Sequence, residues 1–557
     1  TGRNIEIINE QPAAGGPFVG AQYNQILQIF GGDPSTGNVV QDEVRSSNGD
    51  FSNNESDNYV LTLDWAAGEF DVKSITAISK FKYDEFCDCD FTGTDVFGAA
   101  LQESYEQVSQ EIRISSPLGG KFDYITGLYY QSSDHDYNDQ IVVNSSSVLI
   151  PVVNALAPGF GDLLSNTEAR RQARVDSDVL SAFAQFNFNV SDTVTIQAGG
   201  RITKDERDGF RTLSITSGGG APLPAPQVPA ALVYAQVFGI SSTNLEALGP
   251  QGAFFIGELG QLPVRGNRDE SQFSPELKAI FDFGDDSLMY LSWSEGAKSG
   301  SFDFRANNRS FFPTMEESFE FEDEEASNIE LGAKTVLLDG RMELNAALFF
   351  TEFDDLQISI FDGTLGFNVG NAASAEVQGL ELDWRWAATD NLMVRGGIAF
   401  TDFEFTDFEN GQCFFGATPN TDLDGDGTPE LCSYTGNSNQ LVSDVQGNLT
   451  FDYRRPVGSN LEFASTLDLF YTSEYDASAT FDPALVQDAY SLINLRLAIG
   501  AADGGWQVAL LGKNLGDEKV LTFGGDTPLA GSTFGAKSNY AFFTPGTTYT
   551  LQGLFRF

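Results

Sequence analysis

The feature of this sequence that most constrains its fold is a regular alternation of short and long connections between strand-like stretches. The stretches come in pairs, and the connection within a pair is a tight turn rich in Gly, Asp and Asn, which tolerate hairpin geometry. Examples are LDGR, which joins 326–337 to 342–353, and ATDN, which joins 375–386 to 392–405. Between pairs the connections are long and irregular, as in 206–271. A soluble β-sandwich has no reason to keep this rhythm, whereas a membrane barrel has short turns on one side and long loops on the other.

The last stretch of the chain, 544–557, shows the alternation of a strand with two different faces. One face is aromatic and apolar, and the other is mostly polar. The apolar face carries Tyr549, Leu551, Gly553, Phe555 and Phe557. In a soluble sandwich this face would meet a second sheet, and in an outer-membrane barrel it would meet lipid. Together with the alternating connections, the pattern favours the barrel and predicts that this strand pairs with 506–513.

The predicted fold class is all-β, a transmembrane antiparallel β-barrel of about 17 strands in this chain. Bacterial single-chain barrels usually have an even number of strands, so the odd count predicts that upstream strands are absent. We therefore assign residues 1–57 to an extracellular loop or a remnant of upstream barrel strands. Residues 58–557 are assigned to a barrel with long extracellular loops.

Composition excludes several function classes. The sequence has no run of about 18 or more apolar residues, so no transmembrane helix is predicted. A net charge of −48 argues against a nucleic-acid partner, because phosphate binding needs clustered Lys and Arg. Such an acidic surface attracts cations, and it suits either a saline habitat or contact with outer-membrane lipid and lipopolysaccharide bridged by divalent ions. There is no GxSxG, HExxH or complete phosphate loop, and His135 is the only histidine, so we expect that the protein is not an enzyme.

Several blocks of the sequence, through their order and spacing, resemble the TonB-dependent outer-membrane receptor family. They include FDVKSITAISKFKYD (70–84), IELGAKTVLLDGRMELNAALFFTEFDDLQ (329–357), VGNAASAEVQGLELDW (369–384) and KNLGDEK (513–519), followed by the terminal FRF. The resemblance implies a barrel of about 22 strands filled by an amino-terminal plug, with the plug and its TonB box missing from this chain. It places the protein in the outer membrane of a Gram-negative bacterium.

The same resemblance implies active import of a scarce bulky nutrient, of the siderophore-iron, vitamin or oligosaccharide class. The implied partners are this small-molecule ligand, TonB and the inner-membrane complex that energises it. The alternative is a passive porin or a surface-interaction barrel without energy coupling. A soluble all-β binding protein is a third, weaker interpretation. No residue in the sequence selects among the ligands, and binding residues do not carry over because loops vary most.

The sharpest local motif is DLDGDG at 422–427, which has carboxylates at alternate positions followed by Gly. Such a loop can wrap a hard cation such as Ca²⁺ with oxygen ligands. The candidate ligands are Asp422, Asp424, Asp426, Thr428 and Glu430. The position of the bidentate ligand in an EF-hand is Ser433 here, so the loop is not a complete EF-hand. A solvated acidic turn explains the same sequence, and both interpretations stay open.

The four cysteines fall in two predicted outer loops. Cys413 and Cys432 bracket the acidic motif, and an oxidising folding route favours a disulfide between them. Cys87 and Cys89 are separated by one residue, and we favour a disulfide there over free thiols or a soft-metal site.

Two apolar stretches in the long connections, 148–164 and the segment after 221–229, predict short helices near the barrel mouth. The sequence does not separate ligand lids from the interior of folded loops.

Overall fold

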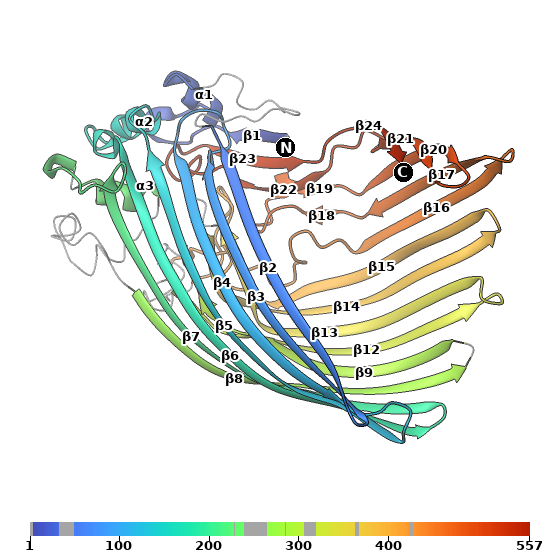
Figure 1. Cartoon of the computed structure of the whole chain (residues 1–557). Helices are drawn as coiled ribbons and strands as arrows, with labels where there is room; N and C mark the ends of the chain where they lie inside the picture. The colour runs from blue at the N-terminus through green and yellow to red at the C-terminus, as the bar shows by residue number, and fades with distance from the viewer. Residues whose placement is uncertain are drawn as a thin grey trace.

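The dominant feature of the computed structural model is a single antiparallel sheet of seventeen strands wound into a barrel (Figure 1). The described residues are 4–32, 49–227, 229–238, 264–284, 286–305, 319–361, 367–422 and 427–556. The barrel strands are β2 (Phe51–Ala67), β3 (Phe70–Cys87), β4 (Gly98–Ser115), β5 (Phe122–Val143), β6 (Thr167–Ser191), β7 (Val194–Ser217), β8 (Val264–Gly284), β9 (Ser287–Lys298), β12 (Glu324–Leu337), β13 (Met342–Phe361), β14 (Phe367–Thr389), β15 (Leu392–Asp407), β16 (Val445–Val457), β17 (Leu461–Thr472), β20 (Tyr490–Ala501), β21 (Trp506–Lys513) and β24 (Thr548–Phe555). The fold class and the count of seventeen strands are confirmed.

Each barrel strand pairs with the next barrel strand along the chain, which gives sixteen antiparallel pairings from β2 to β24. The predicted pairing of the last strand with 506–513 is confirmed, with Leu551 opposite Leu510. The strand order is that of a closed barrel. However, within the described chain no residue register joins β24 to β2, and both strands are exposed along nearly their whole length. We therefore describe the wall as unpaired along this one seam, because a closed wall requires a hydrogen-bonded ladder there.

The outer face of the wall changes abruptly from apolar to charged. Leu180, Ile202 and Phe273 are outward-facing residues on β6, β7 and β8, and all three are more than half exposed. Two residues further toward the long connections, on β7, Lys204 pairs with Glu206 and lies 3.5 Å from Asp269. An apolar outer band bordered by charge is the pattern of a lipid-facing barrel wall. The strands continue beyond this border, so that the upper part of the wall stands outside the lipid band.

The short elements gather at the end of the barrel where the long connections lie, and we call this assembly the cap (Figure 1). Its elements are β1 (Asn4–Gln11), η1 (Gly16–Phe18), α1 (Tyr23–Ile29), α2 (Leu149–Leu156), η2 (Gly161–Leu164), η3 (Ala225–Gln227), α3 (Ala230–Phe238), β10 (Ser301–Phe302), β11 (Glu320–Phe321), β18 (Tyr475–Asp476), η6 (Pro483–Leu485), β19 (Val486–Gln487), β22 (Leu521–Asp526) and β23 (Lys537–Phe543). None of the helices in the described ranges is long and apolar enough to cross a membrane.

The largest apolar core of the described chain lies in the cap. Tyr23 of α1, Leu149 of α2 and Phe238 of α3 are fully buried in one cluster that also holds Phe534 and Tyr540 from the last long connection. The two helices predicted from apolar stretches are therefore present as α2 and α3. Their apolar side chains pack into this core, and the part of the second stretch that follows Phe238, toward Phe255, lies outside the described residues.

The amino-terminal segment belongs to the cap through strand pairing. β1 pairs antiparallel with β23, with Ile7 opposite Tyr540, and β22 flanks β23 on the other side. β2 begins at Phe51, earlier than the residue 58 expected from the sequence. The first residues of β2, FSNNESD, lack alternating apolar side chains because this part of the wall stands outside the lipid band.

Candidate functional site

A cavity of about 300 Å³ opens at the mouth of the barrel, and we call it the mouth cavity. Four neighbouring strands, β3 to β6, supply one wall. The β3–β4 connection, the β9–β12 connection and the last long connection supply the rest. The residues that give it chemical character are Phe91, Phe97, Tyr137, Asp139, Arg171, Arg305 and Tyr540. A volume of this size is at the lower end for small-molecule pockets, so the cavity fits one group of a bulky ligand.

Arg171 is the central polar group of the mouth cavity. Its Nε donates to Asp139 Oδ1 over 2.7 Å, and its Nη2 donates to the other carboxylate oxygen, so the pair is bidentate. Its third nitrogen, Nη1, donates to the backbone carbonyl of Arg305 over 2.6 Å. Arg171 and Asp139 are almost fully buried, and such forked pairs hold both planes in a fixed orientation.

Tyr137, which lines the same cavity, belongs to a group of contacting rings. The ring centroid of Phe304 lies 5.3 Å from that of Tyr137 and 5.4 Å from that of His135. The single histidine does not stand alone, because His135 Nε2 lies 2.6 Å from Glu103 Oε1. Arginine and aromatic side chains in one cavity can bind planar, delocalised and partly anionic groups by stacking and cation–π contact.

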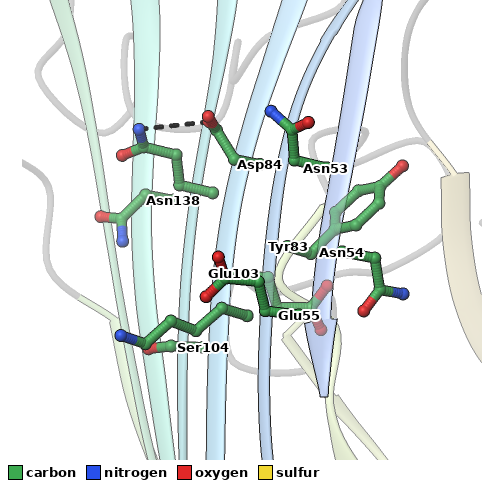
Figure 2. Close-up of a pocket in the computed structure, with 10 residues that line it drawn as sticks. Asn53, Asn54, Glu55, Tyr83, Asp84, Glu103, Ser104 and Asn138 are labelled. Carbon is green, nitrogen blue, oxygen red and sulfur yellow. Dashed lines mark hydrogen bonds between the residues drawn. The ribbon is translucent and has the colours of Figure 1, made fainter.

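A larger polar pocket of about 690 Å³ runs along β2 to β5 (Figure 2). Amides and carboxylates dominate its lining, which includes Asn53, Glu55, Asp84 and Glu103, with Lys82 as a cation. Gln102 donates to Asp84 over 3.4 Å. One wall of this pocket is β2, the strand at the unpaired seam. We place the candidate site at the mouth cavity instead, because its walls are fixed by strand pairing and buried side chains.

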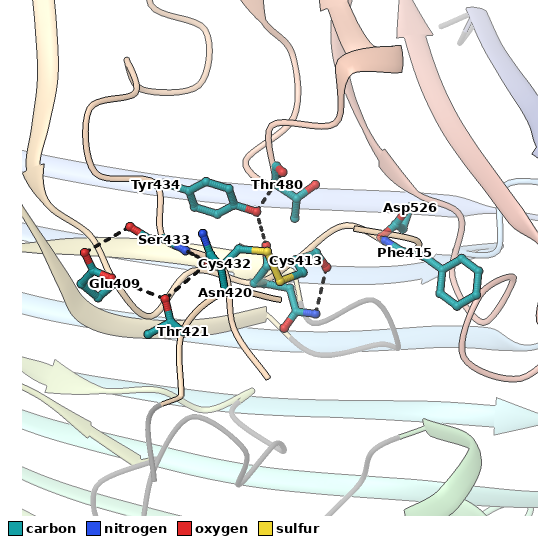
Figure 3. The surroundings of a disulfide bond; sticks show 11 residues. Glu409, Cys413, Phe415, Asn420, Thr421, Cys432, Ser433, Tyr434, Thr480 and Asp526 are labelled. Carbon is teal, nitrogen blue, oxygen red and sulfur yellow. Dashed lines mark hydrogen bonds between the residues drawn. A yellow bond between two sulfur atoms is a disulfide. The ribbon is translucent and has the colours of Figure 1, made fainter. Parts of the chain in front are cut away.

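Both predicted disulfides are present, Cys87–Cys89 and Cys413–Cys432, each with a Cα–Cα distance of 5.2 Å. The first lines the mouth cavity. The second ties together the β15–β16 connection (Figure 3). There Tyr434 Oη donates to Thr480 O over 2.9 Å, which joins this connection to the next one.

Two residues that flank the acidic motif pair with each other within the β15–β16 connection. Thr421 and Leu431 form two backbone hydrogen bonds of 3.0 and 3.1 Å. Asp422 Oδ2 accepts a hydrogen bond from Gly427 N over 2.7 Å, and Thr428 and Glu430 also belong to the described residues. Asp424 and Asp426 lie outside the described residues, so calcium binding at this motif stays a prediction.

A buried charge network that the sequence did not predict joins the cap elements. Lys537 Nζ lies 2.8 Å from Glu10 and 3.0 Å from Asp482, and Asn539 Nδ2 donates to both acids. Nearby, burial raises the pKa of Asp526 to about 6, against the opposing effect of the hydrogen bond from Phe415 N. The residues of this charge network come from connections that are far apart in the sequence, so only the folded cap brings them together.

The fold defines a class, a lipid-facing β-barrel whose long connections fold into a cap at one end. The family model "TonB dependent receptor-like, beta-barrel" matches residues 7–526, and the chain belongs to this family. It is therefore a protein of the Gram-negative outer membrane, as the resemblance implied.

Known relatives support the assignment. An 89-residue segment is 36% identical to the probable TonB-dependent siderophore receptor PiuA of Acinetobacter baumannii, covering 16% of this chain and 11% of PiuA. The ferric yersiniabactin uptake receptor FyuA of Yersinia pestis matches with a TM-score of 0.60 and 15% identity, over 89% of this chain and 62% of FyuA. The crystal structure of PiuA matches with a TM-score of 0.57 and 15% identity, over 90% of this chain and 64% of PiuA. These structures support the fold, and this chain spans less than two thirds of their length.

Proposed function

We propose that this chain is the barrel of a TonB-dependent transporter that imports a metal chelate of the siderophore-iron class. The observation that carries the proposal is the family match, which runs along residues 7–526. Siderophore receptors among the relatives favour iron chelates over the vitamin and oligosaccharide classes. The partners of the whole protein are then the chelate, TonB and the inner-membrane complex that energises it.

The geometry of the mouth cavity supports this proposal. Siderophore chelates present planar carboxylate or phenolate groups, and the cavity wall offers aromatic rings, Tyr137 among them, beside the guanidinium groups of Arg171 and Arg305. The cavity lies at the lumen-side mouth, where a ligand arriving from outside first meets the barrel wall. Because its volume is small, it would take one chelating arm while the rest of the ligand contacts the lumen.

The test is uptake of radiolabelled iron from a panel of ferric siderophores, in cells with and without the gene. We expect loss of uptake for one chelate class in the deletion strain, restored by the full-length gene. The same loss is expected when TonB is absent, because the import is energised. Uptake that persists without TonB would instead support the passive-porin alternative.

A second proposal concerns the segment 422–430, which we assign as a Ca²⁺ site. Alternating carboxylates that end in Gly427, which has a positive φ of 93°, support it, because this spacing folds oxygens around a hard cation. Titration of the purified protein with Ca²⁺ tests the site. Binding that survives Asp422→Asn together with Glu430→Gln would contradict it.

A further inference from the structure

The β9–β12 connection has two described arms, 299–305 and 319–323, which we call the strap. The arms are joined by the pairing of β10 with β11, where Phe302 lies opposite Glu320. Asp303 N also donates to Phe319 O over 2.6 Å. The two described arms are therefore joined to each other by backbone pairing.

The strap docks against the inner face of the barrel wall through a notch made by two glycines. Gly209 of β7 and Gly266 of β8 lie directly opposite each other in the strand register. A Cβ atom at Gly209 would lie 2.4 Å from the Phe302 ring, and one at Gly266 would lie 2.2 Å from it. Both positions are seven residues from the outward-facing Ile202 and Phe273, an odd separation, so they face the lumen.

Phe302 fills this notch as a wedge. Its side chain is 5% exposed, and its ring stacks on Phe319 with the centroids 5.0 Å apart. The guanidinium of Arg211 lies 5.4 Å from the Phe319 ring, on the side of the β7 wall. A wedge of this kind depends on the missing side chains of both glycines, because a methyl group at either position overlaps the ring.

Arginines of the wall hold the strap on both sides of the wedge. Arg207 Nη1 donates to Gly300 O over 2.8 Å, and Arg171 Nη1 donates to Arg305 O over 2.6 Å. Asp303 is buried and accepts from Arg305 N over 2.9 Å and Val369 N over 2.8 Å. Burial raises the pKa of Asp303, which the two backbone donors oppose. Wall residues therefore hold the strap on both sides of the wedge, and Glu322 of the strap also pairs with Arg268 of β8.

The strap forms one side of the mouth cavity. Arg305 lines the cavity, and Phe304 contacts Tyr137, another lining residue. Arg171 belongs to both features, because it lines the cavity and holds the strap backbone. We propose that the Phe302 wedge keeps the strap shut against the mouth cavity, so that Gly209 and Gly266, which lie outside the cavity, control access to it. The inference rests on the proposed function only in taking this cavity as the entry of the ligand.

The test measures access to the cavity and needs no ligand. All four native cysteines are in disulfides, so Leu101→Cys places a single thiol on the cavity wall. In the Leu101→Cys background, Gly209→Ala expels the wedge, and Phe302→Ala removes it. We expect each to raise the labelling rate by a charged, membrane-impermeant thiol reagent about tenfold or more, because overpacking the notch and deleting the ring both weaken the docking of the strap.

Gly199→Ala is the matched control. Gly199 also lies on the lumen side of β7, but a Cβ there would be 3.5 Å from its nearest neighbour, which is an ordinary contact. It should leave the labelling rate unchanged. Hydrogen exchange of the peptide spanning 300–305 provides a second readout and should quicken in the two wedge variants alone.

Equal labelling rates in the wedge variants and the control would overturn the inference, as would faster exchange of the strap without faster labelling. Because neither readout uses a siderophore, failure of the wedge is distinguishable from failure of the transport proposal. Phe302→Ala adds no atoms and causes no steric clash. It therefore keeps the test decisive if Gly209→Ala folds poorly.

Discussion

Glu10 and Lys537 lie near opposite ends of the sequence, and their charged groups are 2.8 Å apart inside the cap. Lys537 is 7% exposed and lies 3.0 Å from Asp482, which is 1% exposed. The pair fastens β1 to the connection that contains β23. It makes the amino-terminal segment an integral part of the cap.

Lys537→Met is therefore expected to loosen β1. Removing one partner of a buried ion pair leaves the carboxylates uncompensated, at a cost of about 3 kcal/mol. Hydrogen exchange of residues 4–11 measures the effect. The control is Lys519→Met. It removes an exposed ion pair in which Lys519 Nζ lies 2.7 Å from Glu6, a residue of β1 like Glu10, and it should cost about 0.5 kcal/mol. Equal protection in the two variants would contradict the expectation.

Asp526 gives the cap a pH dependence. Burial raises the pKa of its carboxyl to about 6 in the folded cap, above its ordinary value. The folded state therefore holds this proton more tightly than the unfolded state, and cap stability falls as pH rises from about 4 to about 6. Asp526→Asn keeps an acceptor for Phe415 N and should stabilise the cap by about 2 kcal/mol at pH 7.5, with little effect near pH 4. Exchange of the Phe415 amide, corrected for intrinsic rate, tests this. Stabilisation that is the same at both pH values would exclude a titrating Asp526.

The Cys413–Cys432 disulfide closes a loop with a sequence separation of 19 residues. A loop of this length gives about 3 kcal/mol of stabilisation by restricting the unfolded chain. The double variant Cys413→Ser and Cys432→Ser should make the β15–β16 connection sensitive to protease. The short loop of Cys87–Cys89 encloses far less chain entropy, so its removal serves as the control and should change cap stability less. A larger effect at Cys87–Cys89 would argue against the chain-entropy account.

The change from apolar to charged residues on the outer face of the wall predicts where a new charge is tolerated. Leu277 faces outward on β8 within the apolar band and is 49% exposed in the absence of lipid. Leu277→Arg should cost about 2–4 kcal/mol in a bilayer, and Ser271→Arg, on the same face nearer the charged border, about 0–1 kcal/mol. Denaturant unfolding from lipid vesicles measures both. Similar costs at the two positions would show that the border is misplaced.

The barrel was predictable because lipid imposes alternation wherever a strand crosses it. The prediction weakened where that constraint ends, as at Phe51, whose strand begins outside the lipid band. β1 escaped prediction because its partner, β23, lies more than 500 residues away in the sequence. The disulfides were predictable from spacing and compartment alone.

The mouth cavity and the wedge were not predictable for a different reason. Gly209 and Gly266 are ordinary glycines in the sequence, and only the strand register sets them opposite each other. Arg171 is one of several arginines on its strand, and its role depends on Asp139 and the Arg305 carbonyl, both from other parts of the chain. Long-range pairing carries this information, and local pattern does not.

The apolar core of the cap has a consequence for the order of assembly. Its members range from Ile7 to Tyr540, so it cannot form until strands from both ends of the chain are in place. Contacts so distant in sequence form late, because chain closure must precede them. The cap is therefore completed after the wall, and the two ends of the chain depend on each other for one shared core.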